Sequence, residues 1–159
     1  NLYIESCASK ISTTQQRIGK PDKLLFSFHG IPQSYVCEDE PYQSQCLVTA
    51  SLIAKKLNLN ESQYEVAFQS RFGKAEWIKP YLSSRLEELP QEGIYNIHVF
   101  CPGFSSDCLE TIDEIGRESK EEFFEHGGKS FEFISCLNSE ESFINALMNI
   151  QKKADIKIL

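Results

Sequence analysis

Positive charge is scarce in this sequence, and long hydrophobic runs are missing from it. The 159 residues include 16 Lys and Arg against 23 Asp and Glu, a formal net charge of −7. A nucleic-acid-binding protein needs clustered Lys and Arg to displace the counterions of the phosphate backbone, so we expect no nucleic-acid partner. No apolar run approaches the roughly 20 residues that span a bilayer. Any contact with a membrane is therefore expected to be peripheral.

Several common catalytic and cofactor motifs are also missing. The sequence has no GxGxxG, Walker loop, HExxH or GxSxG, so dinucleotide-binding, nucleotide-binding, zinc-protease and serine-hydrolase functions lose their usual support. Its six cysteines form no CxxC pair and follow no secretory signal, so we expect reduced thiols in the cytoplasm. The spacings of Cys37 with Cys46 and of Cys101 with Cys108 match no common cluster pattern, and we expect no iron–sulfur cluster.

The length and the 41% hydrophobic content suit one domain, residues 1–159. The chain opens inside a helical pattern and without Met, which we interpret as a piece of a longer polypeptide. Strand-like segments alternate with amphipathic helical ones. The predicted strands are 23–28, 64–69, 94–101 and 131–134, and the predicted helices are 2–18, 45–57, 79–89, 106–125 and 140–152. This alternation predicts an α/β domain of three layers, with a four-stranded parallel sheet and helices on both faces.

Polar or glycine-containing sequence follows each of the first three predicted strands. His29 and Gly30 follow the first, residues 69–73 the second and residues 102–107 the third. The carboxyl ends of parallel strands share one rim, where α/β proteins bind ligands. His29 is therefore either a catalytic base or a histidine that only completes its strand end.

The helix after the third strand is acidic. Glu110, Glu114 and Glu118 recur at i, i+4 and i+8, which places three carboxylates along one helical face although like charges at that spacing repel. From 107 to 125 there are eight acidic residues against Arg117 and Lys120, a local net charge of −6. One reading is a solvated face. The other is a path for a hydrated divalent cation such as Fe²⁺, which accepts oxygen and imidazole ligands.

A few further side chains allow two readings each. Arg71 either holds an anionic group of a substrate or pairs with a neighbouring Glu. Phe72, Trp77 and Phe104 either face a flat aromatic ligand or pack in the core. His98, within a strand, and His126, at a helix end, are interpreted as structural.

Three segments together resemble one family. Residues 25–32 (LFSFHGIP), 68–73 (FQSRFG, followed by Trp77) and 101–111 (CPGFSSDCLET) are similar to the C-terminal half of bacterial ferrochelatases, which insert ferrous iron into protoporphyrin IX in the last step of heme biosynthesis. The resemblance covers about residues 4–150. It implies a lyase in which His29 and Glu110 are catalytic and metal-contacting, and in which Glu114 and Glu118 continue a metal or proton path.

The same resemblance implies the binding partners. Substrate contacts are expected from Arg71, Trp77, Phe104 and Ser106, Fe²⁺ is the substrate metal, and no organic cofactor is expected. Family members are about twice as long and build the porphyrin cleft between two similar domains. The N-terminal half is then a missing partner, and this fragment alone is expected to be inactive. We expect a cytoplasmic protein, with peripheral contact at the inner membrane as the membrane-associated alternative.

Two departures from the family are visible. Cys108 stands where some members carry a second histidine, so no histidine pair is available there. Residues 154–159 contain no cysteine, so a tail-ligated cluster is not expected. We hypothesise that His29 is the principal proton acceptor, whereas the sequence leaves open which of His29 and Glu110 first meets the metal.

Two other functions stay open from the sequence. One is a half-size homodimeric chelatase that inserts cobalt or nickel into another tetrapyrrole, against which the long ferrochelatase-like segments argue. The other is a flavodoxin-like binding module without catalysis, in which His29 and Glu110 only complete their strand and helix.

Overall fold

A parallel sheet forms the centre of the computed structural model, which describes residues 2–37 and 40–155. Its strands are β1 (Lys23–His29), β2 (Tyr64–Gln69), β3 (Asn96–Phe100) and β4 (Ser130–Ile134), in the order β2-β1-β3-β4. β1 lies between β2 and β3, with His29 opposite Gln69 and Phe26 opposite Phe100. The predicted α/β class and four-stranded parallel sheet are confirmed.

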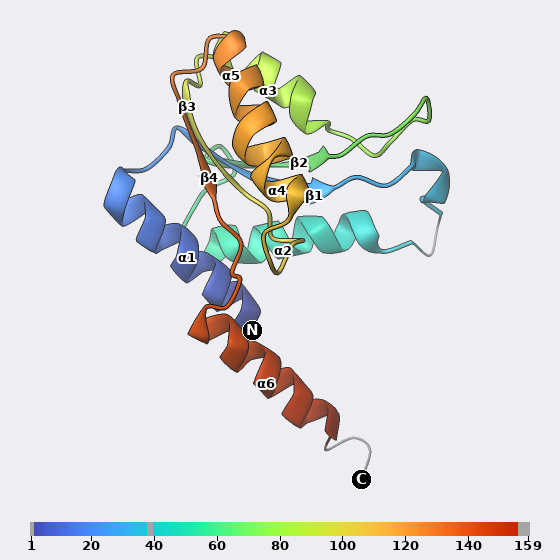
Figure 1. The fold of residues 1–159 in the computed structure, drawn as a ribbon, viewed down its shortest axis with the longest axis vertical. Helices are drawn as coiled ribbons and strands as arrows, with labels where there is room; N and C mark the ends of the chain where they lie inside the picture. Colours follow the sequence, from blue (N-terminus) through green and yellow to red (C-terminus); the bar gives the residue numbers. More distant parts are fainter. Residues whose placement is uncertain (1, 38–39, 156–159) are drawn as a thin grey trace.

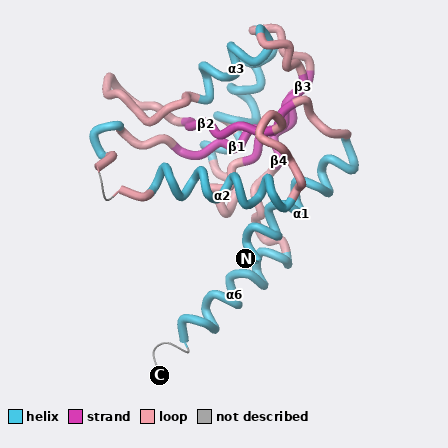
Figure 2. Tube along the Cα trace, turned by 180° about the vertical axis from the view of Figure 1, so that it is seen from behind, coloured by secondary structure: helices cyan, strands magenta, loops and turns pink. Residues whose placement is uncertain are grey.

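Helices cover both faces of this sheet (Figures 1 and 2). α1 (Leu2–Ile18) and α2 (Tyr42–Lys56) lie on one face, and α6 (Glu141–Asp155) packs against α1. α3 (Leu82–Gln91), α4 (Leu109–Ile112) and α5 (Lys120–Glu125) belong to the other face. Side chains alternate along β1, so Leu24, Phe26 and Phe28 pack toward α1 and α2 whereas Leu25 packs toward α3 and α5. Each face thus has its own apolar core.

The strand order creates a topological switch point. From β1 the chain crosses to β2 on one side, and from β3 it crosses to β4 on the other side. The segments that follow β1 and β3 therefore diverge at one rim, between the ends of two neighbouring strands. Open α/β sheets bind their ligands at such a point.

Two loops extend from that rim beside each other (Figure 1). The loop after β1 includes the short 3₁₀ helix η1 (Gln33–Tyr35) and pairs with the loop after β2. The Gln33 amide donates to the Glu76 carbonyl at 2.8 Å, and the Ile78 amide donates to the Ile31 carbonyl at 3.0 Å. This antiparallel pairing holds Trp77 next to the end of β1.

The helix predicted over 106–125 differs from the observed one. It begins at Leu109, because Asp107, a residue type that often caps helices, instead accepts hydrogen bonds from the Cys136 amide and the Asn138 side chain. Cys108 is the N-cap, and Thr111 completes the capping box. The middle of the segment, η2 (Glu114–Ser119), is a π-helix, in which the Asp113 carbonyl accepts from the amides of both Arg117 and Glu118.

The helix predicted from 79 also starts later, at Leu82. Lys79 and Pro80 continue the preceding loop, where the Pro80 carbonyl accepts a hydrogen bond from the Phe68 amide at 2.9 Å. The loop is thereby attached to β2 before the helix can begin.

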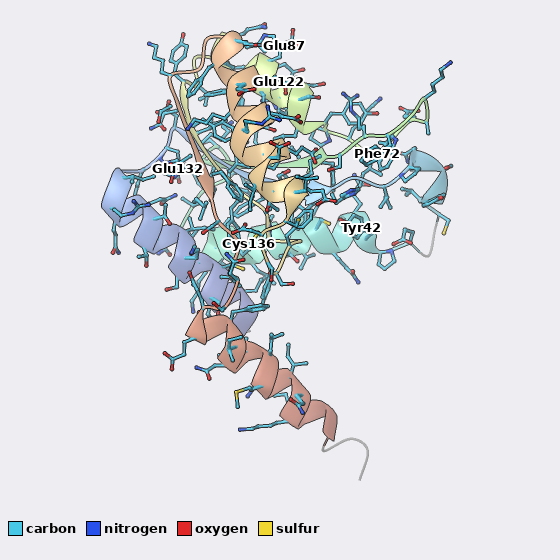
Figure 3. All side chains as sticks on the ribbon, viewed as in Figure 1. Tyr42, Phe72, Glu87, Glu122, Glu132 and Cys136 are labelled. Atoms are coloured by element: carbon cyan, nitrogen blue, oxygen red, sulfur yellow. The ribbon has the colours of Figure 1, made fainter. Side chains whose placement is uncertain are left out.

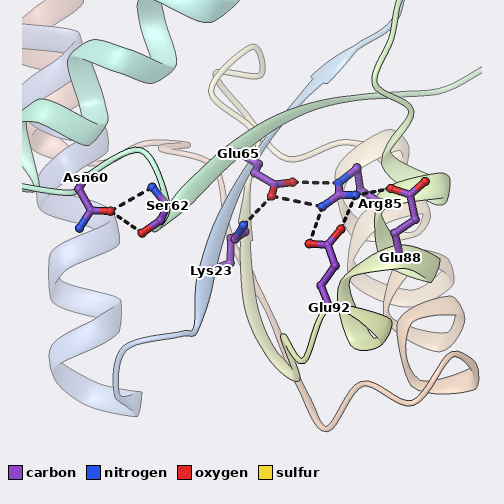
Figure 4. A network of polar contacts seen from close by, with 7 residues as sticks. All are labelled: Lys23, Asn60, Ser62, Glu65, Arg85, Glu88 and Glu92. Atoms are coloured by element: carbon purple, nitrogen blue, oxygen red, sulfur yellow. Dashed lines mark hydrogen bonds and ion pairs between the residues drawn. The ribbon is translucent and has the colours of Figure 1, made fainter.

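An ion-pair network joins α3 to the sheet (Figure 4). Glu65 on β2 accepts from Lys23 Nζ at 2.6 Å and from Arg85 Nε at 2.9 Å, and Arg85 also pairs with Glu88 and with Glu92. Burial raises the pKa of Glu65, but the two cations outweigh it and the pKa is lowered. In the turn before β2, the Asn60 carboxamide accepts hydrogen bonds from the amide and hydroxyl of Ser62.

All six cysteines have free thiols, and four of them are buried. None of the helices in residues 2–37 and 40–155 is long and apolar enough to cross a membrane. The expectation about the C-terminal tail falls partly on residues 156–159, which lie outside the described residues.

Candidate functional site

His29 is half-buried at the end of β1. Its Nδ1 lies 2.6 Å from the Gly30 carbonyl oxygen, and its ring centroid lies 6.3 Å from that of Trp77. The Tyr42 hydroxyl donates to the His29 carbonyl at 2.8 Å, which fixes the backbone. Because a carbonyl oxygen only accepts, Nδ1 carries a proton, and Nε2 of the neutral ring is left to accept one.

Gly30 allows β1 to end close against its neighbours. A Cβ at this position would lie 3.0 Å from the Gln69 carbonyl oxygen and 3.2 Å from a ring carbon of Trp77. Any larger residue would therefore push the end of β1, and His29 with it, away from β2.

Glu110 lies in the first turn of α4, next to the N-cap Cys108. Its own backbone amide and the Cys108 thiol lower the pKa of Glu110, and the charge of His29 lowers it further. The two residues come from the segments at the ends of β1 and β3, and Gln69 joins these segments: its carbonyl accepts from the Gly30 amide, and its side chain donates to the Glu110 carbonyl. The switch point thus brings together the predicted base and the predicted carboxylate.

Glu114 is held by the end of β2. Its Oε1 accepts from the Ser70 amide at 2.7 Å, and its Oε2 accepts from the Ser70 hydroxyl at 2.6 Å. Ser70 adopts a positive φ of 63°, which a non-glycine residue keeps only where its surroundings impose it. Here the two hydrogen bonds to Glu114 are part of those surroundings.

Two cavities adjoin these carboxylates. One, of about 350 Å³, is lined by polar and apolar side chains from the β2 loop and the acidic helix: Ser70, Arg71, Phe72, Leu109, Glu110, Asp113, Glu114 and Glu118. The other, of about 510 Å³, shares Ser70, Arg71, Glu114 and Glu118 with the first and adds Glu122. All three predicted carboxylates therefore line one cavity, even though the helix that carries them is π-helical in its middle.

Arg71 stands between the two cavities. Its guanidinium lies over the Tyr81 ring, 4.1 Å from the centroid, and donates to the Ser83 hydroxyl at 3.1 Å. Burial raises the pKa of Glu122, and Arg71 is among the cations that oppose this rise. Figure 3 shows Glu122 of α5 beside Glu87 of α3, whose charge raises the pKa of Glu122 further.

The remaining predicted substrate residues are spread over the rim. Trp77 is buried beside His29, and its Nε1 donates to the Phe72 carbonyl at 3.1 Å. Phe104 is half-buried against the core beneath α3 and α5, whereas Ser106 is exposed in the loop after β3. The structure thus brings Trp77 to His29 and Arg71 to the carboxylates. Phe104 and Ser106 belong to the β3 loop.

Sequence reasoning missed Gln69 and Ser70 as site residues. Both are buried, and both donate hydrogen bonds to the acidic helix. The available signal was two polar residues directly after the apolar end of a central strand, where burial obliges polar groups to find partners. The other histidines lie elsewhere, His98 buried within β3 and His126 at the end of α5.

The candidate metal-contacting residues do not form a closed coordination shell. In the part of the chain that the structure describes, no three or more His, Cys, Asp or Glu side chains are placed to hold a metal ion together. Glu110, Glu114 and Glu118 line the smaller cavity, and Glu114 and Glu118 also line the larger one.

Comparison with known proteins gives consistent matches. A family model described as Ferrochelatase matches residues 1–155. The chain is 47% identical over 148 residues to a ferrochelatase of Idiomarina loihiensis and 46% identical over 150 residues to one of Janthinobacterium sp. (strain Marseille). These alignments cover 93% and 94% of this chain, but 41% of each relative. The chain thus spans about two fifths of the length of the curated relatives it matches.

The fold is also similar to a solved structure named for the cobalamin (vitamin B12) biosynthesis protein CbiX of Marinobacter aquaeolei VT8. The TM-score is 0.56 at 12% identity, and the match covers 86% of this chain and 99% of the other. At this identity the likeness concerns the fold alone.

Proposed function

Because the chain belongs to the ferrochelatase family, we propose that it carries the His29 and Glu110 wall of an enzyme that inserts Fe²⁺ into protoporphyrin IX to form protoheme. The observation that supports the proposal is that Glu110, Glu114 and Glu118 line one cavity at the rim where β1 ends in His29. A base and an ionised carboxylate at one rim suit a reaction that removes protons and admits a cation.

Metalation of a porphyrin requires three changes. Two pyrrole protons leave, the metal ion loses its water, and the flat ring bends so that its nitrogen lone pairs point toward the ion. With Nδ1 on the Gly30 carbonyl, His29 Nε2 is the ring nitrogen that accepts a proton. Glu110, kept ionised, accepts the second proton or passes the metal. A cleft that binds the bent ring more tightly than the flat ring lowers the barrier.

Fe²⁺, the substrate metal, reaches the ring along the carboxylates in this proposal. Glu110, Glu114 and Glu118 line the same cavity. A site that passes a metal onward requires exchangeable oxygen ligands rather than a closed shell. Glu114 is the carboxylate of this path whose position is fixed, because Ser70 donates two hydrogen bonds to it.

The porphyrin itself lies against the rim. Trp77 packs beside His29, and Arg71 provides a guanidinium that matches a carboxylate group of the substrate. Phe72 and Leu109, two apolar residues that are 66% and 75% exposed, line the smaller cavity. The relatives' additional length supplies the opposite wall of the cleft, so the fragment alone is expected to be inactive.

The test is anaerobic insertion of Fe²⁺ into protoporphyrin IX, followed by Soret absorbance, in the full-length protein that contains this chain. His29→Ala should lower kcat by about 10²–10⁴, the usual contribution of a general base. His126→Ala is the matched control and should leave kcat unchanged. Near-normal metalation by His29→Ala would exclude His29 as the proton acceptor, and porphyrin binding without metalation in the unmodified protein would favour a binding module instead.

A further inference from the structure

Gln69 is a buried amide between the two sides of the site. It is the last residue of β2, and 3% of it is exposed. Its Oε1 accepts from the Ser27 hydroxyl at 2.7 Å and lies 3.6 Å from the Cys101 sulfur. Its Nε2 donates to the Glu110 carbonyl at 2.7 Å and lies 3.5 Å from Glu114 Oε2. One side chain therefore contacts β1, the end of β3 and the acidic helix.

The partners allow only one orientation of this amide. The Glu110 carbonyl and the Glu114 carboxylate are acceptors, so the NH₂ end must face them. The carbonyl end then faces the Ser27 hydroxyl and the Cys101 thiol, which both donate. A flipped amide would set an oxygen against two oxygens in a buried place, where unpaired polar groups are costly.

The backbone of Gln69 holds the other catalytic candidate. Its carbonyl accepts from the Gly30 amide at 2.8 Å, directly after His29, and Gln69 lies opposite His29 in the β1–β2 register. Ser27, the partner of the side chain, precedes His29 by two residues on the same strand. The strand that carries His29 and the helix turn that carries Glu110 are thus attached to the same residue.

We propose that Gln69 is a positioning residue that sets the separation of His29 from Glu110 and orients the Glu114 carboxylate, with Ser27 fixing the direction of its amide. Gln69 touches neither metal nor porphyrin in this role. The expected effect of Gln69 on metalation rests on the proposed function. The expected effect of Gln69 on the stability of the helix turn that carries Glu110 does not.

The experiment uses the full-length protein with Gln69→Met, which keeps the length of the side chain but removes both hydrogen-bonding ends. Amide hydrogen exchange of residues 109–114 should become at least tenfold faster, while exchange of residues 96–100 in β3 stays unchanged. In metalation kinetics, kcat should fall about 10- to 100-fold, because a displacement near 1 Å costs that much, with little change in KM for protoporphyrin. Gln63→Met, at the other end of β2 and exposed, is the matched control.

Ser27→Ala is the second variant, because it removes one hydroxyl without changing Gln69. It should accelerate exchange in the same residues, 109–114, by a smaller factor. Unchanged exchange there in both variants would overturn the proposal, and so would equal acceleration in 96–100, which would make Gln69 a core residue only. If the unmodified protein does not metalate protoporphyrin, the proposed function fails, while the exchange measurement still decides the role of Gln69.

Discussion

Asp107 joins three segments through one carboxylate. It accepts hydrogen bonds from the Cys136 amide at 2.9 Å, the Asn138 side chain at 2.7 Å and the Thr111 hydroxyl at 3.3 Å. Burial raises the pKa of Asp107, but these donors outweigh it and the pKa is lowered. The residue thereby fixes the loop after β4 against the turn that precedes Glu110.

Asp107→Ala should lower the free energy of unfolding by about 2–3 kcal/mol at pH 7, because it leaves buried donors unpaired. A carboxylate with a lowered folded-state pKa stabilises the protein above its unfolded pKa of about 3.9 and loses this effect as the pH falls through the folded value. The difference in free energy of unfolding between the unmodified protein and Asp107→Ala should therefore be smaller at pH 3 than at pH 7. Urea unfolding of both full-length proteins at the two pH values measures this difference. Asp113→Ala removes an exposed ion pair with Arg117 and should lower the free energy of unfolding much less than Asp107→Ala does. An equal loss for the two variants would contradict the prediction.

At the scale of elements, the type of a helix or strand is predicted well from local sequence, whereas the exact start and the internal geometry of the acidic helix are not. The continuous apolar run of β1 and the helical spacing of apolar residues in α6 depend on neighbours in sequence, so the existence and type of both elements are predicted closely. Gly127 and Gly128 end the acidic segment: both amides donate to carbonyls of the last helical turn, and Gly127 has φ +99°.

The start of that segment could not be predicted, because the Asp107 carboxylate accepts from the Cys136 amide and the Asn138 side chain and does not cap the backbone amides of the helix. The π-helical middle is equally hidden from a periodicity of 3.6. His29 and the three carboxylates, Glu110, Glu114 and Glu118, were predicted as site residues because they follow strand ends. Their catalytic roles stay a proposal. The bridge through Gln69 depends on contacts between residues about forty positions apart, for which a single sequence contains no direct signal.

Two glycines in and just after this segment should differ in how much alanine destabilises the protein. A Cβ on Gly128 would lie 2.2 Å from ring carbons of Phe123, which is fully buried, whereas a Cβ on Gly116 would meet its nearest atom, in Phe133, at 3.5 Å. Gly128→Ala should destabilise by about 1–3 kcal/mol through overpacking. Gly116→Ala should change stability by no more than about 1 kcal/mol, because the contact is ordinary. Chemical unfolding of both variants is the measurement, and a larger loss for Gly116→Ala would show that the π-segment needs glycine.

At the scale of the whole molecule, α6 extends beyond the body (Figure 1). Phe143 and Ala146 are buried near its start, and apolar side chains continue along the same helix with 42–60% exposure: Ile144, Leu147, Met148 and Ile150. An apolar helix surface of this kind is typical of an interface. The relatives are longer than this chain, and we expect part of their additional sequence to pack on the apolar surface of α6.

We therefore expect Leu147→Ser with Ile150→Ser to act differently in two settings. In the chain alone the double variant should reduce self-association, because it removes exposed apolar area. In the full-length protein it should lower the melting temperature, because the same area is then buried. Sedimentation of the chain and thermal unfolding of the full-length protein measure the two effects. Glu141→Ser, on an exposed position of the same helix, is the control, and an unchanged melting temperature would mean that the longer protein leaves α6 uncovered.

The packing of α1 against α6 also means that α1 cannot complete its contacts until late in synthesis. Lys10 of α1 pairs with Glu140, 130 residues later, and the ring of Tyr3 packs on Phe143 with centroids 5.9 Å apart. A ribosome adds about 5–20 residues per second, so α1 leaves it roughly 6–26 s before these partners exist. Throughout that interval α1 lacks the cover that α6 later provides, so this apolar side of α1 is open to chaperones before α6 is made.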